Sequence, residues 1–347
     1  MKKKLKIQNV KGVFQAVGCI VITGEGLFSE YLVSEIFSIN DMENFYWAQD
    51  KRIFKKLLGE ISELNPKHMT FEKRLSGSDK MSYNLSGSNA IGFDFSFKTK
   101  NTQIKFFEGG SEVWSKEVEG IFSFPVMSLK YMFFSSLKPG NKIIALNTKD
   151  GGVLWQLDLS ELGKYTDHEG EHSGKVKTEV KYFAPDNSVI FGVTDEVSKN
   201  WAGKKFLSVD AESGDIKWIY KPEDERTLRE DFYFYKNLMY LLSGSNLLII
   251  DPYTGKVKED HDLSDQFSAN SLESFNNYTI QNNKLYFSDT DHKKIGVINL
   301  SSYQIEEVVK VETENADWIE QPVVNNKYLY VKDSNNTLHV FELDAKQ

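Results

Sequence analysis

Cysteine is almost absent from the sequence, since Cys19 is the only one in 347 residues. A single thiol excludes an internal disulfide and a thiolate metal cluster, and it is typical of a reducing compartment. An excess of positive charge is also missing: 42 Lys and Arg residues stand against 50 Asp and Glu, for a formal net charge of −8. Extended phosphate-binding surfaces need a dominant positive field, so we expect no nucleic acid partner.

Long apolar runs are missing as well. No segment approaches the roughly 18 apolar residues of a membrane-spanning helix, so we expect no membrane span. Near the N-terminus, Lys2, Lys3, Lys4 and Lys6 come before "AVGC", which ends at Cys19 and has the form of a bacterial lipoprotein cleavage box. However, Gln8, Lys11 and Gln15 interrupt the required apolar region, and "IVITG" continues it past the cysteine. We therefore predict a cytoplasmic protein, with a periplasmic lipoprotein as the alternative.

Proline is scarce, whereas aromatic residues make up 13% of the chain, which favours a folded, strand-rich protein. The runs "DFYFYKN", "LMYLLSG" and "NLLIIDPYTG" are short, rich in aliphatic and aromatic residues, and separated by turn formers such as Asn237 and Gly244. One segment differs: "KRIFKKLLGEISEL", 51–64, spaces its apolar residues as an amphipathic helix does. We predict an all-β domain over 1–347 with a helical and loop insertion at 51–80.

A repeat organises most of the chain. "LSVDAESGDIKW", 207–218, has the layout of "IALNTKDGGVLW", 144–155: an apolar run, an Asp or Asn, a turn with a glycine, then a Trp. The tryptophan position recurs, with substitutions, at Trp47, Trp114, Trp155, Trp218, Glu259 and Glu307. Repeats of about 40 to 50 residues with four short strands each are typical of propeller blades. Six positions and an unfinished last copy predict seven blades.

These motifs resemble the pyrroloquinoline-quinone-like (PQQ-like) repeat family of β-propellers. The resemblance is best at 207–218 and 144–155, and it is partial at "FFEGGSEVW" and "IIDPYTGKVKE". It implies that the glycine makes a tight turn and that the Trp packs against the neighbouring blade, so we interpret Trp114, Trp155 and Trp218 as structural. The last blade lacks its outer strand. We expect "KKLKIQNV", 3–10, to pair with "TLHVFEL" and close the ring.

The long loops predict which face of the propeller binds a partner. Connections alternate between the two faces of an antiparallel ring, so the insertions at 24–31, 51–80, 160–177 and 194–205 should all emerge on one face. Loops on a rigid scaffold commonly carry function. We predict that a partner protein binds this face; the alternative is that its aromatic residues pack inward and cap the ring. The candidate partner-binding residues are Phe28, His168, Glu169, Glu171, His172 and Trp201.

Several motifs raise the question of catalysis. "HEGEH", 168–172, matches a zinc-protease pattern, but two histidines bind one ion only when a helix places them on one side, and Gly170 disfavours a helix here. The resemblance to the PQQ-like repeat family raises quinone-dependent catalysis, but its catalytic members typically use a vicinal cysteine pair. The lone Cys19 excludes such a pair. "DTDHKK", 289–294, lacks the Gly and distal Glu of a calcium loop and reads as a hairpin tip. We expect no enzyme activity, no metal and no cofactor.

Three hypotheses for function follow from the sequence. The first is a bacterial, non-catalytic, monomeric propeller that binds a protein partner, for complex assembly or toxin neutralisation, and its acidic charge would suit a basic partner. The second is an envelope lipoprotein similar to the subunits that help assemble outer-membrane proteins, a group with eight blades and a signal peptide. The third is a metal- or quinone-dependent enzyme.

Overall fold

The computed structural model describes residues 1–7, 10–16, 18–23, 27–29, 45–49, 52–57, 60–65, 70–76, 82–86, 89–96, 98–127, 130–138, 141–167, 170–173, 176–184, 186–195, 205–221, 232–273, 277–324 and 327–343. In the strands before residue 90, and in parts of some later ones, it describes the backbone only. Within these ranges the chain forms seven four-stranded sheets, one three-stranded sheet and one two-stranded hairpin.

The sheets follow one another along the chain. The first part forms β2 (Val10–Ala16), β3 (Gly18–Thr23) and β4 (Leu27–Ser29), then β5 (Phe45–Gln49), β6 (Arg52–Leu57), β7 (Glu60–Asn65) and β8 (Thr70–Ser76). The middle forms β9 (Ser82–Ser86), β10 (Asn89–Ser96), β11 (Asn101–Glu108) and β12 (Ser111–Glu119); β13 (Ile121–Met127), β14 (Tyr131–Lys138), β15 (Lys142–Asn147) and β16 (Val153–Asp158); and β19 (Val176–Phe183), β20 (Ser188–Asp195), β21 (Lys205–Asp210) and β22 (Ile216–Tyr220).

The last part forms β23 (Phe232–Tyr235), β24 (Leu238–Ser243), β25 (Asn246–Ile250) and β26 (Val257–Asp262); β27 (Asn277–Gln281), β28 (Lys284–Asp289), β29 (Lys294–Asn299) and β30 (Gln304–Lys310); and β31 (Val323–Val324), β32 (Tyr328–Lys332) and β33 (Leu338–Glu342), which β1 (Lys2–Ile7) joins. The 3-10 helix η1 (Ser160–Gly163) and the hairpin β17 (Lys164–Asp167) with β18 (Gly170–Ser173) follow β16, and α1 (Ser264–Ala269) follows β26.

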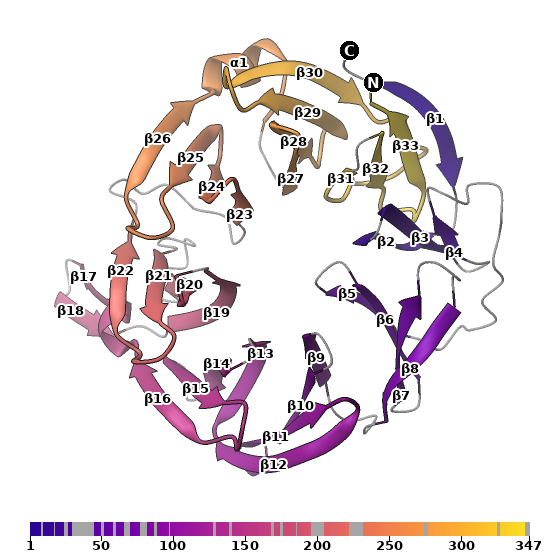
Figure 1. Ribbon diagram of the computed structural model, residues 1–347. Coiled ribbons are helices and arrows are strands. Elements are labelled where there is room, and N and C mark those ends of the chain that lie inside the picture. The colour runs from indigo at the N-terminus through magenta and orange to yellow at the C-terminus, as the bar shows by residue number, and fades with distance from the viewer. Residues whose placement is uncertain are drawn as a thin grey trace.

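The sheets stand side by side in a ring, with the first strand of each nearest the centre (Figure 1). Neighbouring strands within each sheet are antiparallel, as β19 to β22 illustrate. This arrangement confirms the predicted all-β propeller architecture and places the repeated turns at equivalent positions around the ring.

The apolar core is divided into clusters that lie between successive sheets. One cluster joins Phe133 and Trp155 of the β13–β16 sheet to Phe191 and Leu207 of the β19–β22 sheet. Strands inside the sheets are buried on both faces and therefore contain continuous apolar runs, as the four buried residues of "KIIALN" in β15 show. Outer strands such as β22 are largely exposed and bury the Trp that faces the next sheet. Burial between sheets thus explains why a single repeat could not fold alone.

The predicted pairing of the N-terminal strand with the last sheet is confirmed. β1 pairs antiparallel with β33, with Lys2 opposite Glu342 and Ile7 opposite Leu338. In addition, the amino group of Met1 forms an ion pair with Glu307 of β30. The first strand of the chain thus supplies the outer strand of the last sheet and covers an edge that would otherwise be open for pairing.

Two predictions about the first third of the chain are wrong. Residues 52–57 and 60–65 are strands β6 and β7, paired with Leu57 opposite Glu60, so the segment 51–64 is no helix. The pairing of Leu57 with Glu60 makes the two strands a tight hairpin, which the helical pattern concealed. The segment 51–80 therefore belongs to a four-stranded sheet of its own rather than to an insertion.

The predicted count of seven blades is also wrong, because Trp47 was counted as a repeat position. Trp47 lies in β5, the first strand of its sheet, whereas Trp114 lies in β12, a fourth strand, so the two are not equivalent positions. The described strands form eight sheets of three or four strands around the ring.

Candidate functional site

The turns between the third and fourth strands are built by an Asp or Asn side chain. The Asp210 carboxylate accepts hydrogen bonds from the backbone N–H groups of Glu212 and Ser213 at 2.9 and 3.0 Å. Gly214 then adopts a φ of 80°, in the left-handed region that favours glycine. Asp251 caps the turn before Gly255 in the same way. The repeated Asp and Gly therefore fix a tight turn, as the sequence predicted.

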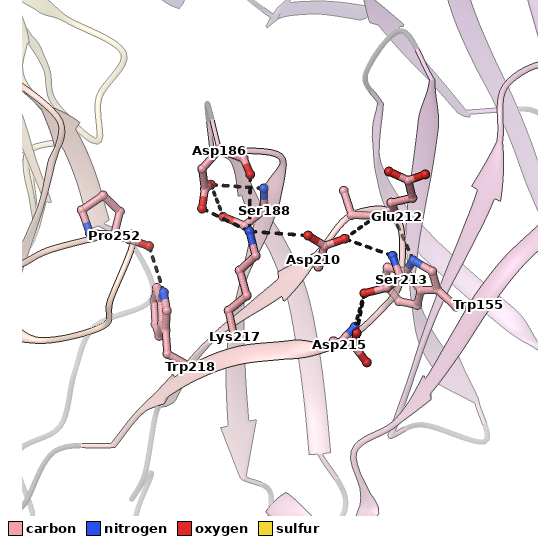
Figure 2. Close-up of polar contacts among 11 residues, drawn as sticks. Trp155, Asp186, Ser188, Asp210, Glu212, Ser213, Asp215, Lys217, Trp218 and Pro252 are labelled. Carbon is pink, nitrogen blue, oxygen red and sulfur yellow. Dashed lines mark hydrogen bonds and ion pairs between the residues drawn. The ribbon is translucent and has the colours of Figure 1, made fainter.

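Each repeat tryptophan contacts the turn of the next sheet. The Trp155 indole Nε1 donates to the carbonyl of Ala211 at 3.0 Å, and Trp218 Nε1 donates to Pro252 at 2.9 Å (Figure 2). Trp114 Nε1 donates likewise to Thr148, at 2.8 Å. The side chains of Trp155 and Trp218 are buried. The prediction that these tryptophans are structural is confirmed, since each donates to the turn of the next sheet, and Trp114 is half-buried in this position.

A cluster of charged residues beside this turn is also structural. Lys217 Nζ lies 3.2 Å from Asp186 Oδ2 and 3.5 Å from Asp210 Oδ2, so one ammonium group bridges two carboxylates within one sheet (Figure 2). The hydrogen bond from the Ser213 N–H, helped by the bond from Glu212 and by Lys217, lowers the pKa of Asp210. The carboxylate is therefore held in its charged form as the cap of the turn.

The contact between neighbouring sheets is different at the fifth repeat position, Glu259. Glu259 replaces Trp, and Tyr303, with a φ of 54°, stands where the other turns have glycine. Hydrogen bonds from His261 and from the Tyr303 hydroxyl lower the pKa of Glu259. Burial, followed by the bond to Glu259, raises the pKa of Tyr303. The His261 ring stacks on Tyr303 with centroids 3.6 Å apart. A polar Glu–Tyr contact thus joins these two sheets in place of Trp and Gly.

The two faces of the ring differ in their connections. Turns between first and second strands and between third and fourth strands share one face, which we call the short-turn face. Loops between second and third strands, and connections between sheets, share the other, the insertion-bearing face. The β17–β18 hairpin joins β16 to β19 and so belongs to the insertion-bearing face.

The predicted partner-binding residues are only partly described. Phe28 lies in strand β4 opposite Val21, so it is not the loop residue that we predicted. Glu171 and His172 lie in strand β18, opposite Thr166 and Tyr165. Their side chains, and the whole of His168, Glu169 and Trp201, lie outside the described residues. Because 170–173 is a strand, "HEGEH" does not present two histidines on one side of a helix.

Trp318 is an exposed aromatic residue that the sequence analysis missed. It lies in the connection between β30 and β31, on the insertion-bearing face, and its relative exposure is 48%. Its backbone is anchored: the Ser334 N–H donates to the Trp318 carbonyl at 3.0 Å, and the next residue, Ile319, is buried and donates to Thr290. Such an indole, held outward by a fixed backbone, is a suitable anchor for a protein interface. The sequence does contain a signal for this residue, because Trp318 is a tryptophan that lies outside the repeat positions.

Acidic side chains surround Trp318. Hydrogen bonds join its segment to the neighbouring loops at Thr290, Lys293, Ser334 and Asn335. These loops and the adjacent connection carry six exposed or half-exposed carboxylates: Glu273, Asp291, Glu312, Glu314, Asp317 and Glu320. Of the three lysines among them, Lys332 pairs with Glu320, and Lys294 donates to backbone carbonyls. No cation in the described ranges pairs with Asp291, Glu312 or Asp317. The surface is therefore net acidic.

Among the described residues, no group of three or more His, Cys, Asp or Glu side chains is placed to hold a metal ion. The predicted hairpin tip at 289–294 is confirmed, since β28 and β29 pair antiparallel with Asp289 opposite Lys294. Asp289 itself is buried, lies 3.1 Å from the His292 ring nitrogen and accepts the N–H of Glu273 at 3.1 Å. Of the helices described, none has the length and apolar character that crossing a bilayer requires.

Comparisons with known proteins agree with this architecture. The model of the family described as outer membrane protein assembly factor BamB matches residues 100–347. No curated protein sequence matches the chain. Among solved structures, BamB from Moraxella catarrhalis has a TM-score of 0.57 at 13% identity, over 98% of this chain and 99% of that one.

Two other propellers match over a similar extent. Sqt1 of Saccharomyces cerevisiae has a TM-score of 0.57 at 12% identity, covering 99% of this chain and all of that one. The computationally designed Ika8 protein has a TM-score of 0.61 at 10% identity over 99% and 100%. At these identities the structural matches show the fold alone.

Proposed function

Because the chain belongs to the PQQ-like propeller family of the outer membrane protein assembly factor BamB, we propose that it is a non-catalytic scaffold that binds a partner protein. The binding surface is the insertion-bearing face. Trp318 is the observation that carries this proposal, because a large apolar side chain is 48% exposed there while its backbone is fixed on both sides. A fixed anchor loses little conformational entropy when a partner covers it.

The partner surface should be positively charged. The carboxylates around Trp318 create a negative potential that attracts positively charged segments and raises the rate of encounter. The partner therefore presents lysine or arginine residues around an apolar or cationic group that packs on the indole. The β17–β18 hairpin extends the same face and is its most prominent described insertion. We place Phe28, His168, Glu169, Glu171, His172 and Trp201 on this face as secondary candidates.

The experiment is quantitative capture of partners from an extract of the source organism. The bait proteins are wild type, Trp318→Ala, a variant with a short Gly-Ser link in place of residues 164–173, and Val113→Ala as a control. Val113 in β12 is also 48% exposed but lies on an outer strand rather than on a loop. We expect one prey that wild type and Val113→Ala retain equally and that the other two variants lose. Equal retention by all four baits contradicts the proposal.

The family supports a second candidate, an envelope lipoprotein of the outer-membrane assembly type. The eight sheets around the ring support this candidate, because the lipoprotein group named in the sequence analysis has eight blades. The two candidates place the chain in different compartments and differ at Cys19. Mass spectrometry of protein isolated from the source organism separates them: an intact N-terminal segment supports the cytoplasmic scaffold, and a diacylated Cys19 at a new N-terminus supports the lipoprotein.

A further inference from the structure

A groove on the short-turn face lies between the β19–β22 and β23–β26 sheets. Its volume is about 180 Å³, and four aromatic rings line it, those of Tyr182, Phe234, Tyr235 and Tyr253. Tyr182 and Phe234 come from the inner strands of adjacent sheets and stack with ring centroids 3.6 Å apart and an interplanar angle of 16°. Tyr253 comes from the turn between β25 and β26 and is 39% exposed. The groove thus has a flat aromatic base and an accessible aromatic wall.

The groove is already held in shape. Pro252 accepts the Trp218 Nε1 hydrogen bond at 2.9 Å, and Asp251 accepts the N–H of Tyr253 at 2.9 Å. The Tyr235 hydroxyl accepts the backbone N–H of Asn283 at 2.8 Å. A ligand that entered this groove would therefore meet side chains whose positions are fixed, which lowers the entropy cost of binding.

The polar groups of the groove are donors. Among the described residues, the hydroxyls of Tyr182 and Tyr253 make no hydrogen bond. Asn237 adds a side-chain amide, and the exposed Lys236 ammonium lies over the Tyr235 ring, 5.2 Å from its centroid. Of the described residues that line the groove, none carries a carboxylate. These residues therefore offer aromatic faces, hydroxyl groups and one positive charge, a combination that disfavours a cationic ligand.

These features fit the chemistry of a polyproline II helix. Such a helix has no internal hydrogen bonds, so its carbonyls are free to accept from hydroxyl donors, and its pyrrolidine rings pack on aromatic faces. A carbohydrate would also stack on the rings, but its many hydroxyls need several planar polar partners, and only Asn237 is of that kind here. We propose that the groove binds a proline-rich segment of another protein, with an acidic residue beside the prolines that pairs with Lys236.

This site goes beyond the proposed function, since it lies on the opposite face. The test is fluorescence anisotropy with a labelled peptide of two glutamates followed by eight prolines. Two further peptides serve as controls, one with Gly-Ser repeats in place of the prolines and one with two lysines in place of the glutamates. The protein is full-length wild type, Tyr253→Ala, Tyr182→Phe, Lys236→Glu, Val257→Ala or Trp318→Ala. Val257 is 44% exposed on β26 and is the matched control for Tyr253. Thermal melts check that each variant is folded.

We expect saturable binding of the Glu-Pro peptide, weakened at least about fivefold by Tyr253→Ala through loss of one aromatic contact. Lys236→Glu should reverse the preference between the glutamate and lysine peptides. Val257→Ala and Trp318→Ala should leave binding unchanged, which separates this site from the partner surface at Trp318. Absence of saturable binding up to about 1 mM, equal binding of the Gly-Ser peptide, or an unaffected Tyr253→Ala variant overturns the proposal. Displacement of the peptide by maltohexaose at lower concentration would assign the groove to carbohydrate instead.

Discussion

Trp155 lies directly over Gly214 of the following sheet, so closely that a side chain at residue 214 has no room. A Cβ atom built on Gly214 would lie 2.7 Å from Cγ of Trp155, below any ordinary van der Waals contact. Trp218 and Gly255 repeat the relationship at 2.7 Å, and Trp114 and Gly151 at 2.9 Å. The repeated glycine therefore has two physical causes, the positive φ of the turn and the tryptophan above it.

Gly214→Ala tests the close approach of this pair. We expect it to lower the free energy of unfolding by about 1 to 3 kcal/mol more than Gly244→Ala does, since overpacking adds to backbone strain. Gly244 is the matched control because its φ of 58° is also positive but a Cβ there meets nothing within 4 Å. Urea melts of both variants give the comparison. Equal losses of stability would show that the tryptophan contributes nothing to the glycine requirement.

The contact between Glu259 and Tyr303 should be replaceable by a Trp–Gly contact. Glu259→Trp alone should destabilise the protein, because the new indole meets the Tyr303 ring where the other turns have glycine. Tyr303→Gly alone loses the stacking with His261 at 3.6 Å. Together the two changes recreate the Trp–Gly contact, so the double variant should be more stable than additivity predicts, by about 1 kcal/mol or more. A double-mutant cycle by urea denaturation measures this coupling, and additive effects contradict it.

Asp210 predicts a dependence of stability on acid. Hydrogen bonds from Ser213 and Glu212 and the charge of Lys217 lower its folded-state pKa below 3.8. A carboxyl group with a lowered folded pKa contributes stability above its unfolded pKa and loses it as pH falls through the folded value. Asp210→Asn keeps a side-chain oxygen for the turn but cannot titrate. Its stability should therefore fall less than that of wild type between about pH 5 and about pH 2. Parallel losses in urea melts at both pH values argue against this role.

The architecture was predictable from the sequence where burial imposes a pattern. Trp155 and Trp218 recur with their turns because each Trp must fit the neighbouring sheet. The residues that meet this requirement lie close together in the sequence, so the pattern is visible there. The pairing of β1 with β33 also followed, from an unfinished last repeat. Residues 51–64 misled us because apolar positions in two hairpin strands, paired as Leu57 with Glu60, coincide with helical spacing over a short segment.

The candidate sites were less predictable because they depend on contacts between distant segments. Trp318 is exposed through hydrogen bonds to Ser334 and through burial of Ile319, and neither is visible as a local pattern. Likewise, Tyr182 and Phe234 belong to different repeats, and only the ring brings their side chains together. The exchange of Trp and Gly for Glu259 and Tyr303 would have been found by aligning the glycine position as strictly as the tryptophan position.

Site-specific photo-crosslinking tests most directly whether the insertion-bearing face binds a partner. A photoreactive phenylalanine derivative replaces Trp318 in one variant and Val113, an exposed residue on the outer strand β12, in another, and both are irradiated in cells of the source organism. We expect one discrete protein adduct from residue 318 that is absent from residue 113 and is competed by purified wild type. The same adducts from both positions, or an adduct from residue 113 alone, would contradict the proposed binding face.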